Sequence, residues 1–263
     1  MLISLVTFPS PVTTPHANNN TVHCEYIEPI GEGPFPGVIV LHILGGDFDL
    51  SRLIGRTLAA HGVAALFVKM PYYGPRQQPD ADVSMISEDP RQTVASMKQA
   101  VLDIRRATAW LGVQEKVDAD DLGIIGVSLG GITAALAATA EPRLGKVFLM
   151  LAGGDVGKIG WESPIVAGLR DRWIAQGGTK ESLFALLREV DPVTYGRNVH
   201  GRKIVMCNAL DDEVIPRACT ESLWHAFGEP EIMWVDGGHY SAARFIFDAL
   251  ARATRLFRSA EED

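Results

Sequence analysis

The pentapeptide Gly126-Val127-Ser128-Leu129-Gly130 is the stretch of this sequence whose residue types and spacing most clearly suggest chemistry. The apolar run 122–125 precedes it and the small-residue segment 131–140 follows it, an order that predicts a strand, a sharp turn and a helix. A serine at such a turn is presented to a cleft as a nucleophile. Gly126 and Gly130 suit the turn because a Cβ at either position would collide with the other side of the elbow.

A serine nucleophile needs a base, and His239 is the best-placed histidine. It follows the last expected strand directly, and Gly237 and Gly238 give its loop the freedom to reach back over the sheet. His42 is the competitor, but it precedes the serine and is followed by Ile43-Leu44-Gly45-Gly46, which suits a loop that donates backbone amides. We expect the remaining histidines to be ordinary surface or capping residues.

The base needs a carboxylate that fixes its tautomer and stabilises the imidazolium. Three acids in a row, Asp211, Asp212 and Glu213, follow an apolar run in the interval between the serine and the histidine. We favour Asp212, with Asp211 as the alternative. Adjacent acids raise the cost of charging any one of them, so we expect the other two side chains to point to solvent.

The tetrahedral oxyanion of acyl transfer needs backbone donors. The amide of Leu129 is one candidate, because it begins a helix whose dipole is directed at the site. The second candidate lies in the loop after strand 38–41, where Gly45 and Gly46 leave amides free to be exposed. We choose Leu44 there, with Ile43 as the alternative.

Buried strands alternating with helices must position these residues. The pattern predicts a single α/β domain over residues 1–263, with a mostly parallel sheet covered by helices on both faces. Ser51 is expected to cap the first helix, Gly62 to end it, and Pro90 to lie in the first turn of the second. The expected strands are 1–6, 22–27, 38–41, 63–68, 122–127, 147–151, 203–208 and 232–235, and the expected helices are 50–61, 89–111, 129–141 and 242–257.

Two segments are candidates for the walls of a substrate pocket. The interval 153–199 is longer than a usual connection, and we expect a small helical cap there whose Trp161 and Trp173 bound the pocket. The alternative is a peripheral helical pair without substrate contact. Tyr72 and Tyr73, after strand 63–68, are expected to line another wall, and a rigid turn with packed tyrosines is their alternative role.

Composition excludes several other classes. The net charge of -8 argues against a nucleic-acid partner, and no apolar run approaches the roughly 20 residues of a membrane span. The three cysteines form no CxxC motif and are expected to be reduced thiols. The N-terminus resembles a strand rather than a signal peptide, so a cytoplasmic location is expected. Without a phosphate-binding loop or a metal-ligand motif, we expect neither cofactor nor metal.

Taken together, these motifs resemble the α/β-hydrolase superfamily over nearly the whole chain. The family order of nucleophile, acid and histidine matches Ser128, Asp212 and His239. The segment Asp212-Glu213-Val214-Ile215-Pro216 is similar to the family's acid loop, and His42-Ile43-Leu44 to its His-Gly-X oxyanion loop, with Ile43 where glycine is usual. Dienelactone-hydrolase-like and small esterase branches are the most similar by motif, but dienelactone hydrolases carry cysteine at the elbow, so their activity is not implied.

The motifs and the resemblance together imply a serine hydrolase that cleaves a small-molecule carboxylic ester through an acyl-enzyme. A thioesterase or small-peptide hydrolase would use the same triad. A fold that only binds ligands is the alternative of another class, although binding alone would need none of the three triad residues. The sequence does not indicate the oligomeric state.

Overall fold

The computed structural model describes residues 1–46 and 48–258 of the 263-residue chain. Over these residues the strands are β1 (Leu2–Pro9), β2 (Thr21–Glu28), β3 (Phe35–Leu41), β4 (Ala64–Val68), β5 (Val117–Val127), β6 (Leu144–Met150), β7 (Lys203–Ala209) and β8 (Glu231–Val235). They form one sheet in the order β1-β2-β4-β3-β5-β6-β7-β8. The β1–β2 and β2–β4 pairings are antiparallel, and all pairings from β4 to β8 are parallel, so the predicted mostly parallel sheet is confirmed.

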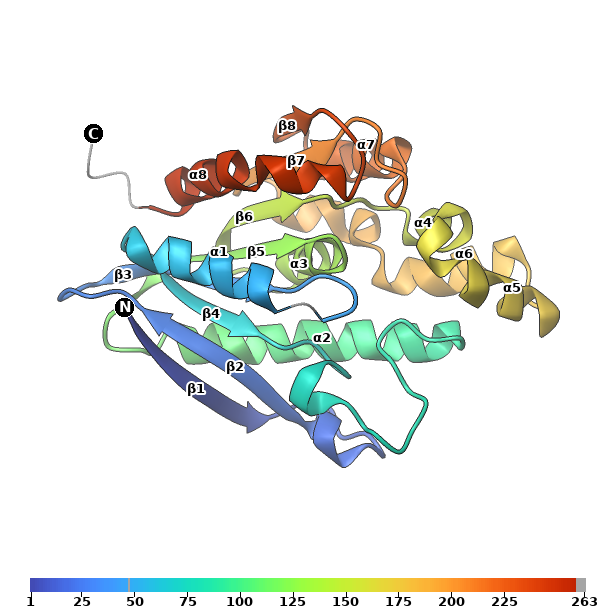
Figure 1. The fold of residues 1–263 in the computed structure, drawn as a ribbon, viewed down its shortest axis with the longest axis horizontal. Coiled ribbons are helices and arrows are strands. Elements are labelled where there is room, and N and C mark those ends of the chain that lie inside the picture. The colour runs from blue at the N-terminus through green and yellow to red at the C-terminus, as the bar shows by residue number, and fades with distance from the viewer. Residues whose placement is uncertain (47, 259–263) are drawn as a thin grey trace.

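Helices cover both faces of the sheet, as predicted (Figure 1). The helices that pack on it are α1 (Asp49–Ala60), α2 (Pro90–Leu111), α3 (Leu129–Ala140), α7 (Arg217–Ala226) and α8 (Ile246–Phe257). The apolar residues of α1 and α8 belong to one buried cluster, and those of α2, α3 and α7 belong to the other. None of the helices in the described ranges has the length and hydropathy needed to cross a bilayer.

Strand β3 illustrates why the central strands consist of continuous apolar runs. Ile39 and Leu41 lie in the cluster with α2 and α3, whereas Val38 and Val40 lie in the cluster with α1 and α8. Successive side chains of a strand point to opposite faces, and here both faces are covered. All four side chains are fully buried, which stabilises the fold by about 1.5–3 kcal/mol for each.

The ends of two helices test the predicted caps. Asp89 caps α2 by accepting a hydrogen bond from the Arg91 amide at 2.9 Å, and Pro90 is its first residue, as predicted. The predicted cap at Ser51 is wrong, because α1 begins at Asp49 and Ser51 is buried inside it. Phe48 is the residue before α1 and has no capping side chain. Its ring packs against Phe67 at 5.4 Å, so tertiary packing sets this end of the helix.

The predicted C-terminal helix 242–257 is interrupted at its start. A 3-10 helix, η6 (Ser241–Phe245), comes first, and α8 follows from Ile246 to Phe257. The α8 helix has a strongly apolar face that includes the buried residues Leu250 and Phe257. The helical spacing of these apolar residues is the reason that the sequence predicts a helix here.

A helical segment separates β6 from β7 and lies beyond the carboxyl ends of the parallel strands (Figure 1). Its α6 helix begins with a capping box in which the Thr179 side chain accepts from the Ser182 amide and the Ser182 side chain accepts from the Thr179 amide. The helices of this segment are α4 (Val156–Glu162), η3 (Pro164–Val166), α5 (Ala167–Ala175), α6 (Lys180–Leu187), η4 (Arg188–Val190) and η5 (Pro192–Val199).

Candidate active site

Ser128 occupies a strained turn between β5 and α3. Its φ of 55° and ψ of -118° lie outside the regions that a serine ordinarily adopts. A Cβ on Gly126 would lie 2.1 Å from the Gly130 carbonyl oxygen, and a Cβ on Gly130 would lie 2.5 Å from the His42 carbonyl oxygen. The Ser128 amide donates to the Met150 carbonyl at 2.9 Å. Glycine is therefore required at both positions, as predicted, but the predicted collision within the elbow holds only for Gly126, because Gly130 is constrained by the end of β3 and the loop after it.

Ser128, His239 and Asp212 form a continuous hydrogen-bonded chain. His239 Nε2 lies 2.9 Å from Ser128 Oγ, and His239 Nδ1 lies 2.8 Å from Asp212 Oδ2 and 3.0 Å from Oδ1. The side chains of His239 and Asp212 are only 8% and 2% exposed. A carboxylate accepts the Nδ1 proton, which leaves the Nε2 lone pair facing the serine hydroxyl.

The Asp212 carboxylate is held on its other side by backbone. Its Oδ1 accepts hydrogen bonds from the amides of Val214 and Ile215 at 2.9 and 2.7 Å. These two donors hold Oδ1 and so orient the carboxylate beside the imidazole. Of the three consecutive acids, Asp212 is the one whose carboxylate contacts the imidazole, and Asp211 is exposed on the surface.

Glu213 is exposed, as expected for a flanking acid, but its side chain also contacts the histidine loop. Its Oε2 accepts a hydrogen bond from the backbone amide of His239 at 2.8 Å. Gly238 makes this approach possible, because a Cβ there would lie 2.1 Å from the same oxygen. Glu213 thus holds the histidine loop in place. No local sequence signal could have identified this contact, because it joins two loops 26 residues apart.

His42 is fully buried and both of its ring nitrogens are occupied. Nε2 accepts from the Met70 amide at 3.1 Å, so Nδ1 carries the proton and donates to the Ile43 carbonyl at 2.8 Å. Burial lowers the pKa of His42 to about 4. A neutral imidazole fixed between two backbone groups supports the loop after β3 and has no nitrogen left to act as a base.

The candidate oxyanion donors lie beside the serine. The first hydrogen bond of α3 runs from the Ile132 amide to the Ser128 carbonyl, so the Leu129 amide belongs to the first turn, which has no partner within the helix. Leu44 lines both of the cavities that open at Ser128, and Ile43 lines one of them. An oxyanion formed at Ser128 would therefore be expected next to the backbone amides of Leu129 and Leu44.

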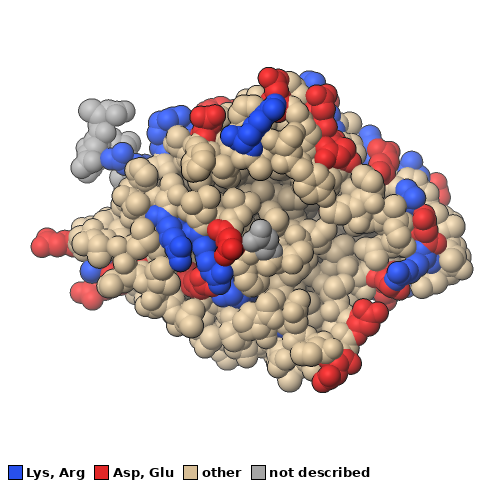
Figure 2. Space-filling model, viewed as in Figure 1, with Lys and Arg blue, Asp and Glu red and all other residues tan. Residues whose placement is uncertain are grey.

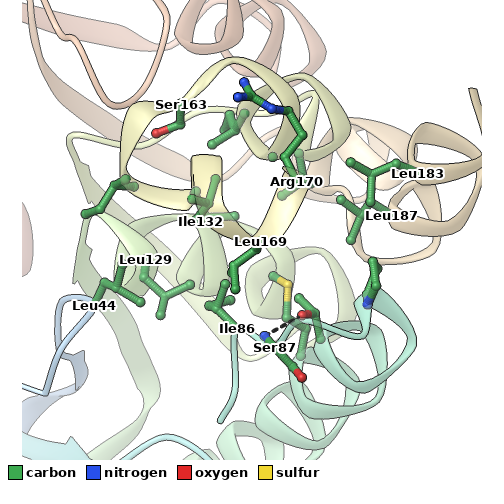
Figure 3. Close-up of a pocket in the computed structure, with 18 of the residues that line it drawn as sticks. Leu44, Ile86, Ser87, Leu129, Ile132, Ser163, Leu169, Arg170, Leu183 and Leu187 are labelled. Carbon is green, nitrogen blue, oxygen red and sulfur yellow. Dashed lines mark hydrogen bonds between the residues drawn. The ribbon is translucent and has the colours of Figure 1, made fainter. Parts of the chain in front are cut away.

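Two mostly apolar cavities meet at Ser128, and Glu88 and Arg170 also line one of them. The cap cavity has a volume of about 130 Å³ and lies beneath the helices between β6 and β7 (Figure 3), where its walls include Ile86, Leu129, Ile132, Leu169, Trp173 and Leu187. The histidine cavity has a volume of about 260 Å³ and lies between α1 and α8, where its walls include Leu50, Val127, Met150, His239, Ala243 and Ile246. Figure 2 shows this face hollowed between α1, α8 and α4, with few charged side chains around the hollow.

The four aromatic residues expected at the pocket are placed differently from one another. Trp173 lines the cap cavity, and its indole Nε1 donates to the Thr179 carbonyl at 3.1 Å. Trp161, Tyr72 and Tyr73 are not among the described residues that line either cavity. Both tyrosines are buried, and the Tyr73 ring lies 4.6 Å from the His42 ring, an arrangement that favours a rigid, packed turn.

Several cavity residues had no signal in the sequence. Ile86 reaches the cap cavity from the loop before α2, Met97 reaches it from within α2, and Leu169 and Arg170 reach it from α5. In Figure 3, Leu44 and Leu129 lie on one side of the cavity and Leu183 and Leu187 on the other, with Ile86 and Leu169 between them. Their convergence depends on how separate elements pack, which no local pattern reports.

Comparisons with known proteins agree with this fold. The sheet order, the elbow and the flanking helices define an α/β hydrolase. The family described as "Alpha/beta hydrolase domain containing 18" matches residues 17–154, more than half of the chain. The chain belongs to this family.

A curated relative from Mycobacterium tuberculosis, Uncharacterized protein Rv2627c, is 31% identical over 214 residues, which cover 78% of this chain and 50% of that protein. The chain thus spans about half the length of the curated relatives it matches. Acetyl xylan esterase from Paenibacillus sp. R4 has a similar structure, with a TM-score of 0.72, 21% identity, and coverage of 97% and 84% of the two chains. Acetyl Xylan Esterase 1 from Thermoanaerobacterium sp. JW/SL YS485 has a TM-score of 0.70, 18% identity, and coverage of 95% and 89%.

Proposed function

We propose that this protein hydrolyses carboxylic esters through an acyl-enzyme intermediate. The observation that carries the proposal is the hydrogen-bonded chain from Asp212 through His239 to Ser128, which ends where two mostly apolar cavities meet. A structural role would need neither a strained serine nor a buried imidazole–carboxylate pair beside it. The two structurally similar acetyl xylan esterases support ester chemistry on this fold.

In the first half-reaction, Ser128 Oγ attacks the ester carbonyl while its proton passes to His239 Nε2. Asp212 stabilises the resulting imidazolium, and the amides of Leu129 and Leu44 hold the oxyanion, with Ile43 as the alternative second donor. The tetrahedral intermediate collapses, the bond between the carbonyl carbon and the alcohol oxygen breaks, and the leaving alcohol takes the proton from Nε2. Water then repeats the sequence on the acyl-serine and releases the acid.

The segment 153–199 acts in this proposal as a cap on a single hydrolase domain. Its support is positional, because Ile159, Leu169 and Trp173 from this segment line the cap cavity. Ile165 lines both cavities and is 45% exposed, so it stands where substrate would enter. A cap that closes over an ester excludes bulk water from the oxyanion.

The test compares Ser128→Ala with wild type on p-nitrophenyl acetate, butyrate and octanoate. Loss of the nucleophile should leave roughly 10³-fold acceleration over water, from binding and the oxyanion donors alone. Ser4→Ala, on the exposed edge strand β1, is the matched control and should keep the wild-type rate. A Ser128→Ala rate within tenfold of wild type would refute the proposal.

The same acyl group presented as a thioester and as an amide tests the neighbouring activities. Hydrolysis of butyryl-thiocholine or a butyryl anilide with a higher kcat/KM than the matching butyrate ester would assign the triad to a thioesterase or an amidase. We expect the oxygen ester to be preferred.

A further inference from the structure

The two cavities that meet at Ser128 are not equivalent chemically. Leu44, Ser128 and Ile165 line both of them. Among the described residues, His239 lines the histidine cavity alone, and Leu129 lines the cap cavity alone. His239 and Leu129 therefore border different cavities beside the nucleophile.

Because His239 lines only one of the two cavities, it determines which cavity receives the alcohol of an ester and which receives the acyl group. The tetrahedral carbon bonded to Ser128 Oγ carries the oxyanion, the acyl group and the leaving oxygen. The leaving oxygen must lie within hydrogen-bond reach of His239 Nε2, because that nitrogen returns the proton that it took from the serine. The alcohol therefore extends from the His239 side, and the acyl group extends to the other side.

We infer that the substrate is an ester with an apolar group on each side of the scissile bond, its acyl group in the cap cavity and its alcohol in the histidine cavity. The inference rests on the proposed ester hydrolysis and adds the class of substrate and its direction. It assigns Leu169 and Trp173 to the acyl group, and Leu53, Ala243 and Ile246 to the alcohol.

The lining of the histidine cavity determines the kind of alcohol. Its described lining residues include no Lys, Arg, Asp or Glu, and apart from Ser128, His239 and Tyr240 they carry aliphatic, aromatic or sulfur side chains. Tyr240 is 65% exposed and stands at the rim. A sugar hydroxyl, the alcohol implied by the name acetyl xylan esterase, would bury several other hydroxyls here without partners. A hydrocarbon alcohol has no such cost.

The volumes of the two cavities limit the lengths of the acyl group and of the alcohol. An apolar cavity of about 150 Å³ holds one benzene molecule. The cap cavity, at about 130 Å³, is close to that size, and the histidine cavity, at about 260 Å³, is twice as large. The acyl group should therefore hold about six carbons and the alcohol up to about twice that number.

Two substrate series followed in a pH-stat test this inference. One series varies the acid from acetate to dodecanoate as methyl esters, and the other varies the alcohol from methyl to dodecyl as butyrates. Each methylene that fits should raise kcat/KM about fourfold. The rise should stop near six carbons in the acid series and continue further in the alcohol series. Equal optima, or a longer optimum in the acid series, would overturn the assignment.

Matched filling variants test the direction independently. Ala243→Phe narrows the histidine cavity from an exposed position, and Leu169→Trp narrows the cap cavity from a half-buried one. Ala243→Phe should lower the ratio of octyl to methyl butyrate turnover at least tenfold, and Leu169→Trp should lower the ratio of methyl octanoate to methyl butyrate turnover. The opposite pairing would overturn the direction.

Leu53→Trp fills the histidine cavity and Val166→Trp fills the cap cavity, each from another wall, so the test remains decisive if a first variant fails to fold.

A peracetylated methyl xyloside tests whether the alcohol group of the substrate is apolar. Hydrolysis of this sugar ester faster than octyl acetate would overturn the inference that the alcohol is a hydrocarbon. If no ester is cleaved and a fluorophosphonate does not label Ser128, the proposed function fails and the inference fails with it. If esters are cleaved with the wrong chain-length pairing, the inference alone fails.

Discussion

Replacing Asp212 by asparagine should disable the site through a single proton. Asp212 Oδ1 accepts from two backbone amides, those of Val214 and Ile215. These donors fix the oxygen of an asparagine at that position, because its NH₂ group has no acceptor to face there. The NH₂ group would then take the place of Oδ2, which lies 2.8 Å from His239 Nδ1.

An NH₂ group at that distance donates to Nδ1 and forces the proton onto Nε2. The nitrogen that faces Ser128 Oγ at 2.9 Å would then be a donor and could not take the serine proton. The same change of tautomer in a serine protease lowers kcat roughly 10⁴-fold, and we expect a loss of that size here. In free energy this is about 5.5 kcal/mol of transition-state stabilisation.

The assay is steady-state hydrolysis of p-nitrophenyl butyrate by wild type, Asp212→Asn and the control Asp211→Asn. Asp211 is exposed and contributes its backbone amide, not its carboxylate, to a bond with the Gly237 carbonyl. Asp211→Asn should therefore stay within about threefold of wild type, since no buried contact is lost. KM should change little in both variants, because the tautomer affects the chemical step.

An Asp212→Asn variant that is folded and retains more than a tenth of the wild-type kcat would refute this reasoning. A larger loss in Asp211→Asn than in Asp212→Asn would place the functional acid at the neighbouring residue.

Three further predictions concern the elbow, the cap and the buried histidine. Gly126→Ala should lower the free energy of unfolding by about 3 kcal/mol in urea titrations, because its Cβ would lie 2.1 Å from the Gly130 carbonyl oxygen. Trp173→Ala should lower the melting temperature and shift the preferred acyl chain upward, since Trp173 lines the cap cavity, whereas Trp161→Ala should affect stability alone. His42 is neutral in the fold, where its pKa is about 4, against an ordinary 6.5. Between these values the unfolded chain binds a proton that the folded chain does not, so stability falls as the pH is lowered. Over this pH range the free energy of unfolding should fall by about 3 kcal/mol because of His42. His42→Gln should abolish this part of the pH dependence measured by urea unfolding.

Each of these predictions has a clear contrary result. A Gly126→Ala variant as stable as wild type would mean that the elbow is looser than the structure shows. Identical chain-length profiles for Trp173→Ala and wild type would exclude Trp173 from the acyl pocket. Parallel curves of stability against pH for His42→Gln and wild type would mean that His42 is not buried in its neutral form.

Much of the site was predictable because its signals are local. Gly126 encodes the elbow through a contact within five residues of sequence, because a Cβ there would collide with the Gly130 carbonyl oxygen. Gly130 instead avoids the carbonyl oxygen of His42, in the distant loop after β3. The apolar run of β3 encodes a strand buried on both faces, and every residue from Val38 to Leu41 is fully buried. The Gly126 contact and the apolar run of β3 are local features of the chain, which is why the sequence predicts them.

The features that escaped prediction all depend on distant packing. The start of α1 is set by Phe48 against Phe67 rather than by the hydroxyl of Ser51. Glu213 acquires its role only because the His239 loop folds back over it. The two cavities are spaces between helices that no single segment encodes, so the positions of their walls could not be derived from sequence.

The chemical reactivity of Ser128 tests the central proposal most directly. Wild-type protein treated with a fluorophosphonate should gain a single adduct by intact mass spectrometry, and peptide mapping should place it on Ser128. Ser128→Ala should gain none, and His239→Ala should react far more slowly, because its serine lacks the base that lies 2.9 Å away. An unmodified wild-type protein, or an adduct on another residue, would contradict the assignment of Ser128 as the nucleophile.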